Sequence, residues 1–342
     1  DKRVDSNLLL DMSGMLNDIG FNLDDELGVA NMAEYHYDDG AVYGFPTKYE
    51  NSRWILINED MFKEAGLDIP YDGWTYSEFL ADAEKLTHGE DQDKVYGVCW
   101  ARKQSGKSIL YALDGVLGAN QIYKNEEGTE VNFDNDVYRA GFNLVKETLD
   151  KGYAIPIEDE FSEDISVANT FLQGKCAIML GVAQMRLCMD QENYPHDFTT
   201  ALVPAPVPDD EKYNTEFYRK QIGTTGAGDL LSISANTKYP EASFEFAMWY
   251  LKGGMSPLVQ GGRIPLWNGV NKDEVLSVLK EKAQGSIDMD SMENYLSLDT
   301  TQGVAAIKGH ASSEISSAWF EEFDAMCYGK QSVDQTVQNM EK

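Results

Sequence analysis

Histidine is the side chain that most often transfers protons or binds zinc near neutral pH. The chain has four of them, His36, His88, His196 and His310, and no two lie four residues apart. The HExxH helix of zinc hydrolases is therefore absent. A G-x-S-x-G nucleophile elbow is absent as well. Because these nucleophile and metal motifs are absent, the sequence gives no sign of a catalytic site or a metal site.

Two further segments resemble ligand loops only in part. The glycine-rich segment 223–228 lacks the order of a dinucleotide loop and has no following Lys-Ser/Thr, so it predicts a turn or a close backbone approach. Asp91-Gln-Asp93 has the start of a calcium loop without its later Gly and Glu. A pair of glycosidase carboxylates stays open, because the chain has 58 acidic residues and none stands out. We expect no cofactor.

Composition narrows the class of protein. With 342 residues, of which 42% are hydrophobic, the chain can form about two domains. Its net charge of −30 argues against nucleic acid and against anionic membranes. No run of 18 apolar residues and no signal-peptide pattern are present. Buried free thiols are expected, since the four cysteines are widely spaced: Cys99, Cys176, Cys188 and Cys327.

Helix signals recur along the chain. The clearest predicts a helix over 74–86, where Thr75 and Glu78 form a capping box and Trp74 and Phe79 a hydrophobic staple. Asn58 predicts a helix start that ends at Gly66. Three more helices are expected over 135–150, around 167–172 with an end at Gly174, and over 242–251 after Pro240.

Short apolar runs predict strands between these helices. They lie at 54–57, 95–99, 176–180 and 230–234, and an extended proline-rich connector occupies 201–208. The alternation of helices and strands predicts an α/β protein.

Several segments in series resemble the bacterial extracellular solute-binding protein family 1, which includes maltose-binding protein. Tyr43-Gly-Phe-Pro46 followed by 54–62 is similar to the family's "YGxP…xYNKDLF" stretch. The segments 64–79 and 171–179 are similar to "EAGLxxP…WTWDEF" and "FxxGKxAM". Further similar stretches, in the family's order, are 202–208, 231–242, 261–265 and 329–333.

The resemblance implies a two-lobed, type II periplasmic-binding-protein-like fold with a hinge. Lobe 1 would hold 1–50 and 226–285, and lobe 2 would hold 51–225 and 286–342. Roughly 60–90 residues of βα units that open the family's lobe 1 have no counterpart before residue 8, at about 30 residues a unit. The chain would cross between lobes near Glu50–Arg53, near Gly223–Gly226 and near Gly285.

The resemblance also implies a function. The chain would be the substrate-binding protein of an ABC importer and not an enzyme. It would capture a carbohydrate in the interlobe cleft, with an oligosaccharide as the first candidate. Closure about the ligand would present it to the permease subunits. A monomer outside the cytoplasmic membrane is expected, either periplasmic or anchored to the cell surface as a lipoprotein. Residues that match cleft positions of the family are Tyr49, Glu50, Trp100, Arg102, Ala183, Gln184, Arg186, Thr224, Thr225, Asp229, Arg263 and Trp267.

Alternatives stay open at this point. Glu50 is equally interpreted as a solvated acid, Trp100 as core and Arg263 as the partner of a lobe 1 acid. The family often places a tryptophan near 183–186, and this chain has none there. The same fold could bind a polyol, an amino sugar or another small solute. A carbohydrate-active hydrolase or an adhesion module without a small ligand are the other classes.

Overall fold

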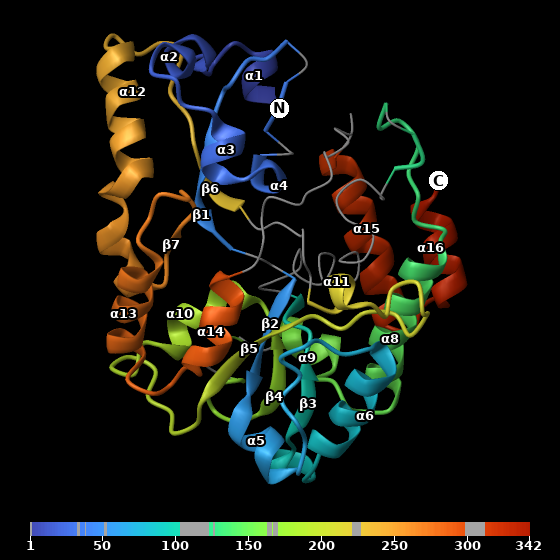
Figure 1. The fold of residues 1–342 in the computed structure, drawn as a ribbon. Coiled ribbons are helices and arrows are strands. Elements are labelled where there is room, and N and C mark those ends of the chain that lie inside the picture. Colours follow the sequence, from blue (N-terminus) through green and yellow to red (C-terminus); the bar gives the residue numbers. More distant parts are fainter. Residues whose placement is uncertain are drawn as a thin grey trace. The chain divides into compact units, whose positions relative to one another are not determined.

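The computed structural model describes residues 2–32, 35–37, 39–50, 53–102, 123–125, 127–162, 166, 170–220, 227–297 and 312–342. Contacts within the chain divide it into two compact units. Unit 1 is built from the described parts of 1–51 and 223–282, and unit 2 from those of 52–222, 283–297 and 307–342. The assignment of lobes made from the sequence stays a prediction, and each unit is described by itself (Figure 1).

Unit 1 contains a three-stranded antiparallel sheet in the order β6-β1-β7. Its strands are β1 (Phe45–Tyr49), β6 (Ala227–Leu231) and β7 (Ile264–Pro265). Lys48 of β1 is the partner of Gly228 on one side and of Pro265 on the other. A Cβ at Gly44 would lie 2.5 Å from Ser232 Oγ, so glycine lets the chain entering β1 approach the strand beside it.

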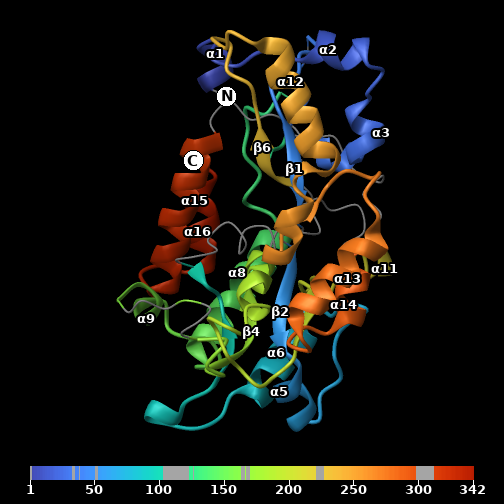
Figure 2. The same cartoon turned by 90° about the vertical axis from the view of Figure 1, so that its left-hand side faces the viewer.

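The rest of the described part of unit 1 is mainly helical. The helices are α1 (Lys2–Asp5), α2 (Ser13–Asp18), α3 (Leu23–Leu27), α4 (Val29–Met32), α12 (Pro240–Trp249), the π-helical turn η3 (Tyr250–Gly254), the 3-10 helix η4 (Ser256–Gly261) and α13 (Lys272–Ala283). Helix α12 lies alongside β1 and β6 (Figure 2), with Phe244, Ala247 and Met248 buried. Pro240 occupies its first turn, as the sequence predicts.

Unit 2 contains a four-stranded mixed sheet in the order β3-β4-β2-β5. The strands are β2 (Trp54–Asn58), β3 (Tyr96–Cys99), β4 (Cys176–Leu180) and β5 (Thr200–Pro204). Strands β3 and β4 run parallel, whereas β2 is antiparallel to both β4 and β5. Every residue of β2, β4 and β5 is buried, so the middle of this sheet is covered on both faces.

The helical elements of unit 2 cover this sheet and continue to the C-terminus. They are α5 (Glu59–Glu64), α6 (Tyr76–Leu86), η1 (Asp91–Asp93), α8 (Asp136–Asp150), α9 (Ile157–Ser162), η2 (Val182–Gln184), α10 (Met185–Cys188), α11 (Glu216–Arg219), α14 (Met289–Leu296), α15 (Ser312–Cys327) and α16 (Val333–Met340). Among the described helices, none has both the length and the apolar character of a membrane span.

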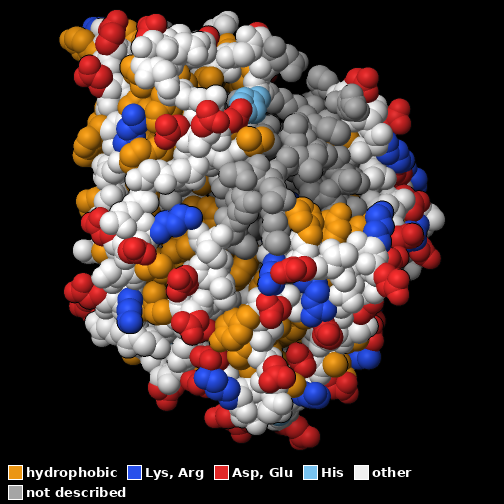
Figure 3. All heavy atoms as spheres, in the orientation of Figure 1, with side chains coloured by type: hydrophobic (Ala, Val, Ile, Leu, Met, Phe, Trp, Pro, Cys, Tyr) orange, Lys and Arg blue, Asp and Glu red, His pale blue; other side chains and the backbone are white. Residues whose placement is uncertain are grey.

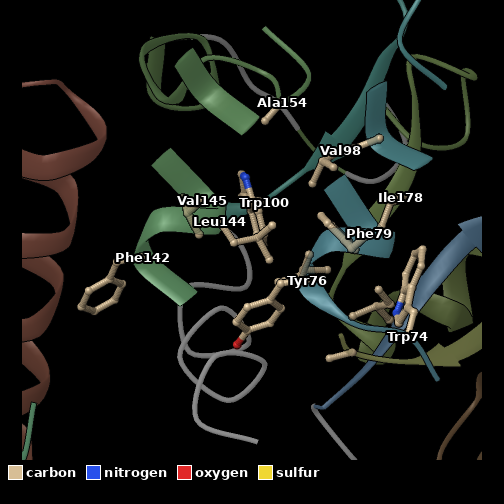
Figure 4. Packing of buried hydrophobic residues seen from close by; sticks show 14 of the residues in the cluster. Trp74, Tyr76, Phe79, Val98, Trp100, Phe142, Leu144, Val145, Ala154 and Ile178 are labelled. Atoms are coloured by element: carbon tan, nitrogen blue, oxygen red, sulfur yellow. The ribbon is translucent and has the colours of Figure 1, made fainter. Parts of the chain in front are cut away.

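Aromatic and aliphatic side chains pack together in the core of unit 2 (Figure 4). The Trp74 and Phe79 rings lie 5.0 Å apart between centroids, as the predicted staple requires. Trp74 Nε1 donates to the Pro204 carbonyl oxygen at 2.9 Å, which satisfies the indole inside the core. Cys99, Cys176 and Cys188 are buried, Cys327 is half-buried, and all four are free thiols.

The predicted helix starts are confirmed where they are described. The capping box is complete, since the Thr75 hydroxyl accepts from the Glu78 amide and the Glu78 carboxylate accepts from the Thr75 amide. Asn58 caps α5 and Asn135 caps α8. Gly66 and Gly174 have φ of +69° and +66°, the left-handed conformation that glycine adopts most easily.

Two predictions of elements need correction. The strand expected at 230–234 runs instead over 227–231, because the chain leaves β1 after Leu231 and Ser234 forms an isolated bridge with Leu9. The helix expected around 167–172 has residues 167–169 outside the described part of the chain. Phe171 and Leu172 lie in a turn and not in a helix, and both are buried.

Candidate ligand-binding residues

Four sequence-predicted residues meet around β1 in unit 1. Tyr49 ends β1 and is buried, and Glu50 follows it. The Glu50 carboxylate forms an ion pair with Lys48, and both side chains are about one-fifth exposed. Asp229 lies on β6 and forms an ion pair with Arg263, which directly precedes β7. Because β6 and β7 flank β1, the topology gathers these charges on neighbouring strands.

The backbone at Asp229 is unusual. Its φ is +54°, a left-handed value that is uncommon outside glycine, although aspartate adopts it more often than most residues. The Thr47 hydroxyl donates to the Asp229 carbonyl oxygen at 2.9 Å. Thr47 is buried, so this bond anchors β6 at the point where the Asp229 side chain pairs with Arg263.

Trp267 lies just beyond β7 and is held by α3. Its Nε1 donates to Glu26 Oε2 at 2.6 Å, and the amide of Asn268 donates to the Glu26 carbonyl oxygen at 2.9 Å. A Cβ at Gly269 would lie 2.3 Å from the indole, so only glycine permits this ring position. The indole is half-buried and fixed, which suits a stacking surface.

In unit 2 two predicted residues make contacts within the unit itself. Trp100 lies among the core side chains (Figure 4) and is 2% exposed. Its Nε1 donates to Thr148 Oγ1 at 2.9 Å. This is the core position that the sequence left as an alternative, so we leave Trp100 out of the proposed contacts.

Arg102 is also engaged within unit 2. Its Nε and Nη2 donate to the two carboxylate oxygens of Asp324 at 2.7 and 3.0 Å. The guanidinium carbon lies 4.1 Å from the ring centroid of Phe320. A bidentate pair stacked on an aromatic ring is a strong structural contact. We therefore interpret Arg102 as part of the framework of unit 2 and not as a ligand contact.

The remaining predicted residues lie near the end of β4 or outside the described chain. Ala183 and Gln184 belong to η2, and Arg186 to α10. Gln184 is half-buried and Arg186 exposed, while the side chain of Ala183 is not described. Gly181 has φ +114°, which turns the chain sharply after β4. Thr224 and Thr225 lie outside the described residues.

A separate cavity of about 410 Å³ lies in unit 1. Asp24 and His36 line it together, with Asp24 Oδ1 2.8 Å from His36 Nε2. Phe21 also lines it, and the Lys252 ammonium lies 4.5 Å from the centroid of that ring. None of the sequence-predicted ligand residues borders this cavity.

One buried acid, Glu160 of α9, is not among the sequence-predicted residues and is 1% exposed. Its carboxylate accepts hydrogen bonds from the amides of Ala101 and Arg102 at 3.1 and 2.6 Å. Burial raises the pKa of Glu160 to about 7, although these donors pull it down. No spacing rule marks such a residue, because its partners lie 58 and 59 residues away.

In the part of the chain that the structure describes, no group of three or more His, Cys, Asp or Glu side chains could hold a metal ion. On the face drawn in Figure 3, acidic and basic side chains are interspersed over both units. This fits the strongly negative net charge of −30 and a well-solvated surface.

Comparison with known proteins identifies the class. The family model of the bacterial extracellular solute-binding protein matches residues 1–252. The chain therefore belongs to this family of extracellular solute-binding proteins, which are not enzymes.

Solved structures agree with the fold. A sugar transporter from Rhizobium etli in an open conformation is 16% identical, with a TM-score of 0.68 over 99% of this chain and 80% of that one. An ABC substrate-binding protein from Listeria monocytogenes in complex with cycloalternan is 16% identical, with a TM-score of 0.69 over 99% and 79%. An ABC transporter solute-binding protein from Agrobacterium vitis with bound D-mannitol is 18% identical, with a TM-score of 0.64 over 99% and 80%. The periplasmic-binding-protein-like fold predicted from the sequence is thus confirmed.

Proposed function

We propose that this solute-binding protein captures a carbohydrate, with an oligosaccharide as the first candidate, and delivers it to the permease of an ABC importer. The observation that carries the proposal is the group around β1 in unit 1, where two ion pairs, Lys48–Glu50 and Arg263–Asp229, lie on neighbouring strands. Carboxylates accept hydroxyl protons, and a guanidinium donates to hydroxyl oxygens. The fixed indole of Trp267 adds an apolar face for a sugar ring.

The rest of the mechanism follows from the family resemblance and stays part of the proposal. The ligand lies between the two lobes, 1–50 with 226–285 and 51–225 with 286–342, and favours closure because only the closed form makes all contacts together. From unit 2, Gln184 and Arg186 are the proposed contributors, with Ala183 through its backbone. Thr224 and Thr225 remain proposed contacts on the same ground. Anchoring as a lipoprotein and a monomeric state are likewise proposed.

A polyol is the second candidate ligand. The Agrobacterium vitis protein was solved with bound D-mannitol. A linear polyol needs the same hydroxyl partners but gives an indole face no ring to stack on. Replacing Trp267 by alanine therefore separates the candidates: it should weaken a cyclic sugar more than mannitol.

The test is a thermal-shift screen of the full-length protein against monosaccharides, linear and cyclic oligosaccharides, and polyols. A ligand present at 100 times its Kd stabilises the native state by about 2.7 kcal/mol, so a true ligand raises the Tm saturably. Glu50→Gln should reduce the shift, whereas Glu245→Gln, an exposed acid on α12, should not. No shift with any compound would overturn the proposal, and cleavage of the bound sugar would indicate a hydrolase.

A further inference from the structure

The cavity of about 410 Å³ in unit 1 is lined both by buried apolar side chains and by accessible polar ones. Leu16, Phe21 and Leu23 supply the buried apolar part. The side chains of His36 and Asp24 are 51% and 35% exposed. Ligand pockets commonly measure about 300–1,000 Å³ and combine apolar walls with a few polar groups. In size and lining, this cavity therefore suits a small molecule.

Hydrogen bonds join the walls of this cavity. The Met12 amide donates to the Val42 carbonyl oxygen at 2.8 Å, and the Val42 amide donates to Asp11 Oδ1 at 3.0 Å. The chain entering α2 is thus fastened to the segment around Val42. Asp24 Oδ1 lies 2.8 Å from His36 Nε2, which joins α3 to the chain 12 residues later. Because the walls are already held, a ligand loses little affinity to ordering them.

Polar groups of the lining keep hydrogen-bonding capacity for a ligand. Asp24 Oδ2 and His36 Nδ1 take no part in the contact between these two residues. Asn22 Oδ1 accepts from the amides of Asp24 and Asp25, which leaves the NH2 group of Asn22 as a donor. In the described part of the chain, the side chain of Asn17 forms no hydrogen bond. Carboxylate, imidazole and amide groups together can both accept from and donate to hydroxyl groups.

The lining also narrows the class of ligand. Phe21 adds an aromatic ring, and the Lys252 ammonium lies 4.5 Å from the centroid of that ring. A sugar ring presents C–H groups that pack on an aromatic ring and hydroxyls that need polar partners. Asp24, the only acid in the described lining, disfavours an anion. A metal ion is disfavoured too, because the described residues contain no group of three candidate ligands.

We propose that this cavity is a second saccharide-binding site, which takes one pyranose ring independently of the ligand contacts proposed around β1. The C–H side of the ring packs against Phe21 and the apolar lining. Its hydroxyls bond to Asp24, His36 and Asn17. The described lining includes none of the residues proposed as contacts around β1, so the two sites can be occupied and disabled separately.

Nuclear magnetic resonance of His36 in the full-length protein tests the site. The probes are methyl α-D-glucopyranoside, methyl α-D-mannopyranoside and methyl β-D-galactopyranoside, and cyclohexanol supplies a ring without the set of hydroxyls. At least one glycoside should shift the imidazole signal of His36 saturably, and His36→Gln assigns that signal. The signal of His88, an exposed histidine of unit 2, should stay in place. No saturable shift with any glycoside, or an equal response to cyclohexanol, would overturn the proposal.

Substitutions in the lining test which groups hold the sugar. Asp24→Asn and Asn17→Ala should each raise the Kd measured at His36 about fivefold, the effect of losing one hydrogen bond. Asn17 is exposed, so its replacement keeps the test valid even if Asp24→Asn disturbs the fold. Asp18→Asn changes an exposed acid of α2 outside the described lining and should leave the Kd unchanged. Equal Kd values in the wild type, Asp24→Asn and Asn17→Ala would overturn the proposal.

A last variant separates this site from the contacts around β1. Arg263→Gln should leave the response of His36 to the glycosides unchanged, because Arg263 does not border the cavity. Loss of that response in Arg263→Gln would place its origin at β1 and overturn the second site. A thermal shift with an oligosaccharide but no response at His36 would also overturn the second site, while the proposed transport function would stand.

Discussion

Tyr71 donates its phenolic hydrogen to Asp288 Oδ2 at 2.6 Å and so joins two residues that are 217 positions apart. Asp288 also caps α14 through the Asp290 amide, and its own amide donates to the Thr200 carbonyl oxygen. One residue thus connects the loop before α6, strand β5 and the segment that re-enters unit 2 at 283–297. Burial and the bond to Asp288 hold the pKa of Tyr71 above its ordinary range.

Replacing Tyr71 by phenylalanine should lower the free energy of unfolding by about 2 kcal/mol, because a hydrogen bond to a charged partner is lost. Asp288 keeps its cap to α14, so the fold should survive. Urea denaturation measures the change, and Tyr239→Phe is the control, since Tyr239 is 71% exposed. A loss no larger than that of the control would mean that the bond adds nothing to the stability of unit 2.

Replacing Thr75 by alanine should cost about 1 kcal/mol, since the capping box of α6 loses its hydroxyl acceptor. The effect should appear as a lower denaturation midpoint with an unchanged slope. Ser77→Ala, an exposed site in the first turn, should stay within about 0.5 kcal/mol of the wild type. Equal effects of the two changes would show that the cap is not what stabilises this helix.

Local signals explain why much of the fold was predictable. Thr75, Asn58 and Asn135 act on amides only two or three residues away, so their roles follow from spacing alone. Strands β2, β4 and β5 of unit 2 are fully buried and appear as largely apolar runs. The strand around Leu230 begins and ends three residues earlier than the sequence predicts. Its bounds are set by hydrogen bonds to β1, which lies about 180 residues earlier in the chain and leaves no local signal.

The candidate site was less predictable because its contacts are distant in sequence. Arg102 and Asp324 are 222 residues apart, so nothing near Arg102 reveals that its guanidinium is already paired. Trp100 follows a strand, a position equally consistent with a binding loop and with the core. Its Thr148 partner, 48 residues away, decides for the core. Lys48 and Glu26 are not among the sequence-predicted residues, because each contributes to the site only through its contact, Lys48 with Glu50 and Glu26 with Trp267.

Stability should depend on pH through Glu160. Its pKa is about 7 in the folded protein and near 4.5 when unfolded, so the native state binds the extra proton between these values. The free energy of unfolding should therefore fall as pH rises from 5 to 8, by on the order of 3 kcal/mol in total. Urea denaturation at several pH values measures it, and Glu160→Gln should remove this part of the slope. A slope shared by both proteins would place its origin in other groups.

Arg263 and Asp229 offer a way to separate ligand binding from stability. Their side chains are 46% and 36% exposed. An ion pair with this much exposure to water contributes only about 0–1 kcal/mol to the free energy of unfolding. Arg263→Gln should therefore leave the denaturation midpoint almost unchanged. If the guanidinium also donates to a ligand hydroxyl, the same change should weaken saccharide binding about tenfold, or ~1.4 kcal/mol. Calorimetric titration measures the Kd, and Lys238→Gln, an exposed cation of unit 1, is the control. A variant that loses stability but binds normally would make Arg263 a framework residue like Arg102, and the ligand contacts of unit 1 would then have to come from Glu50 and Trp267.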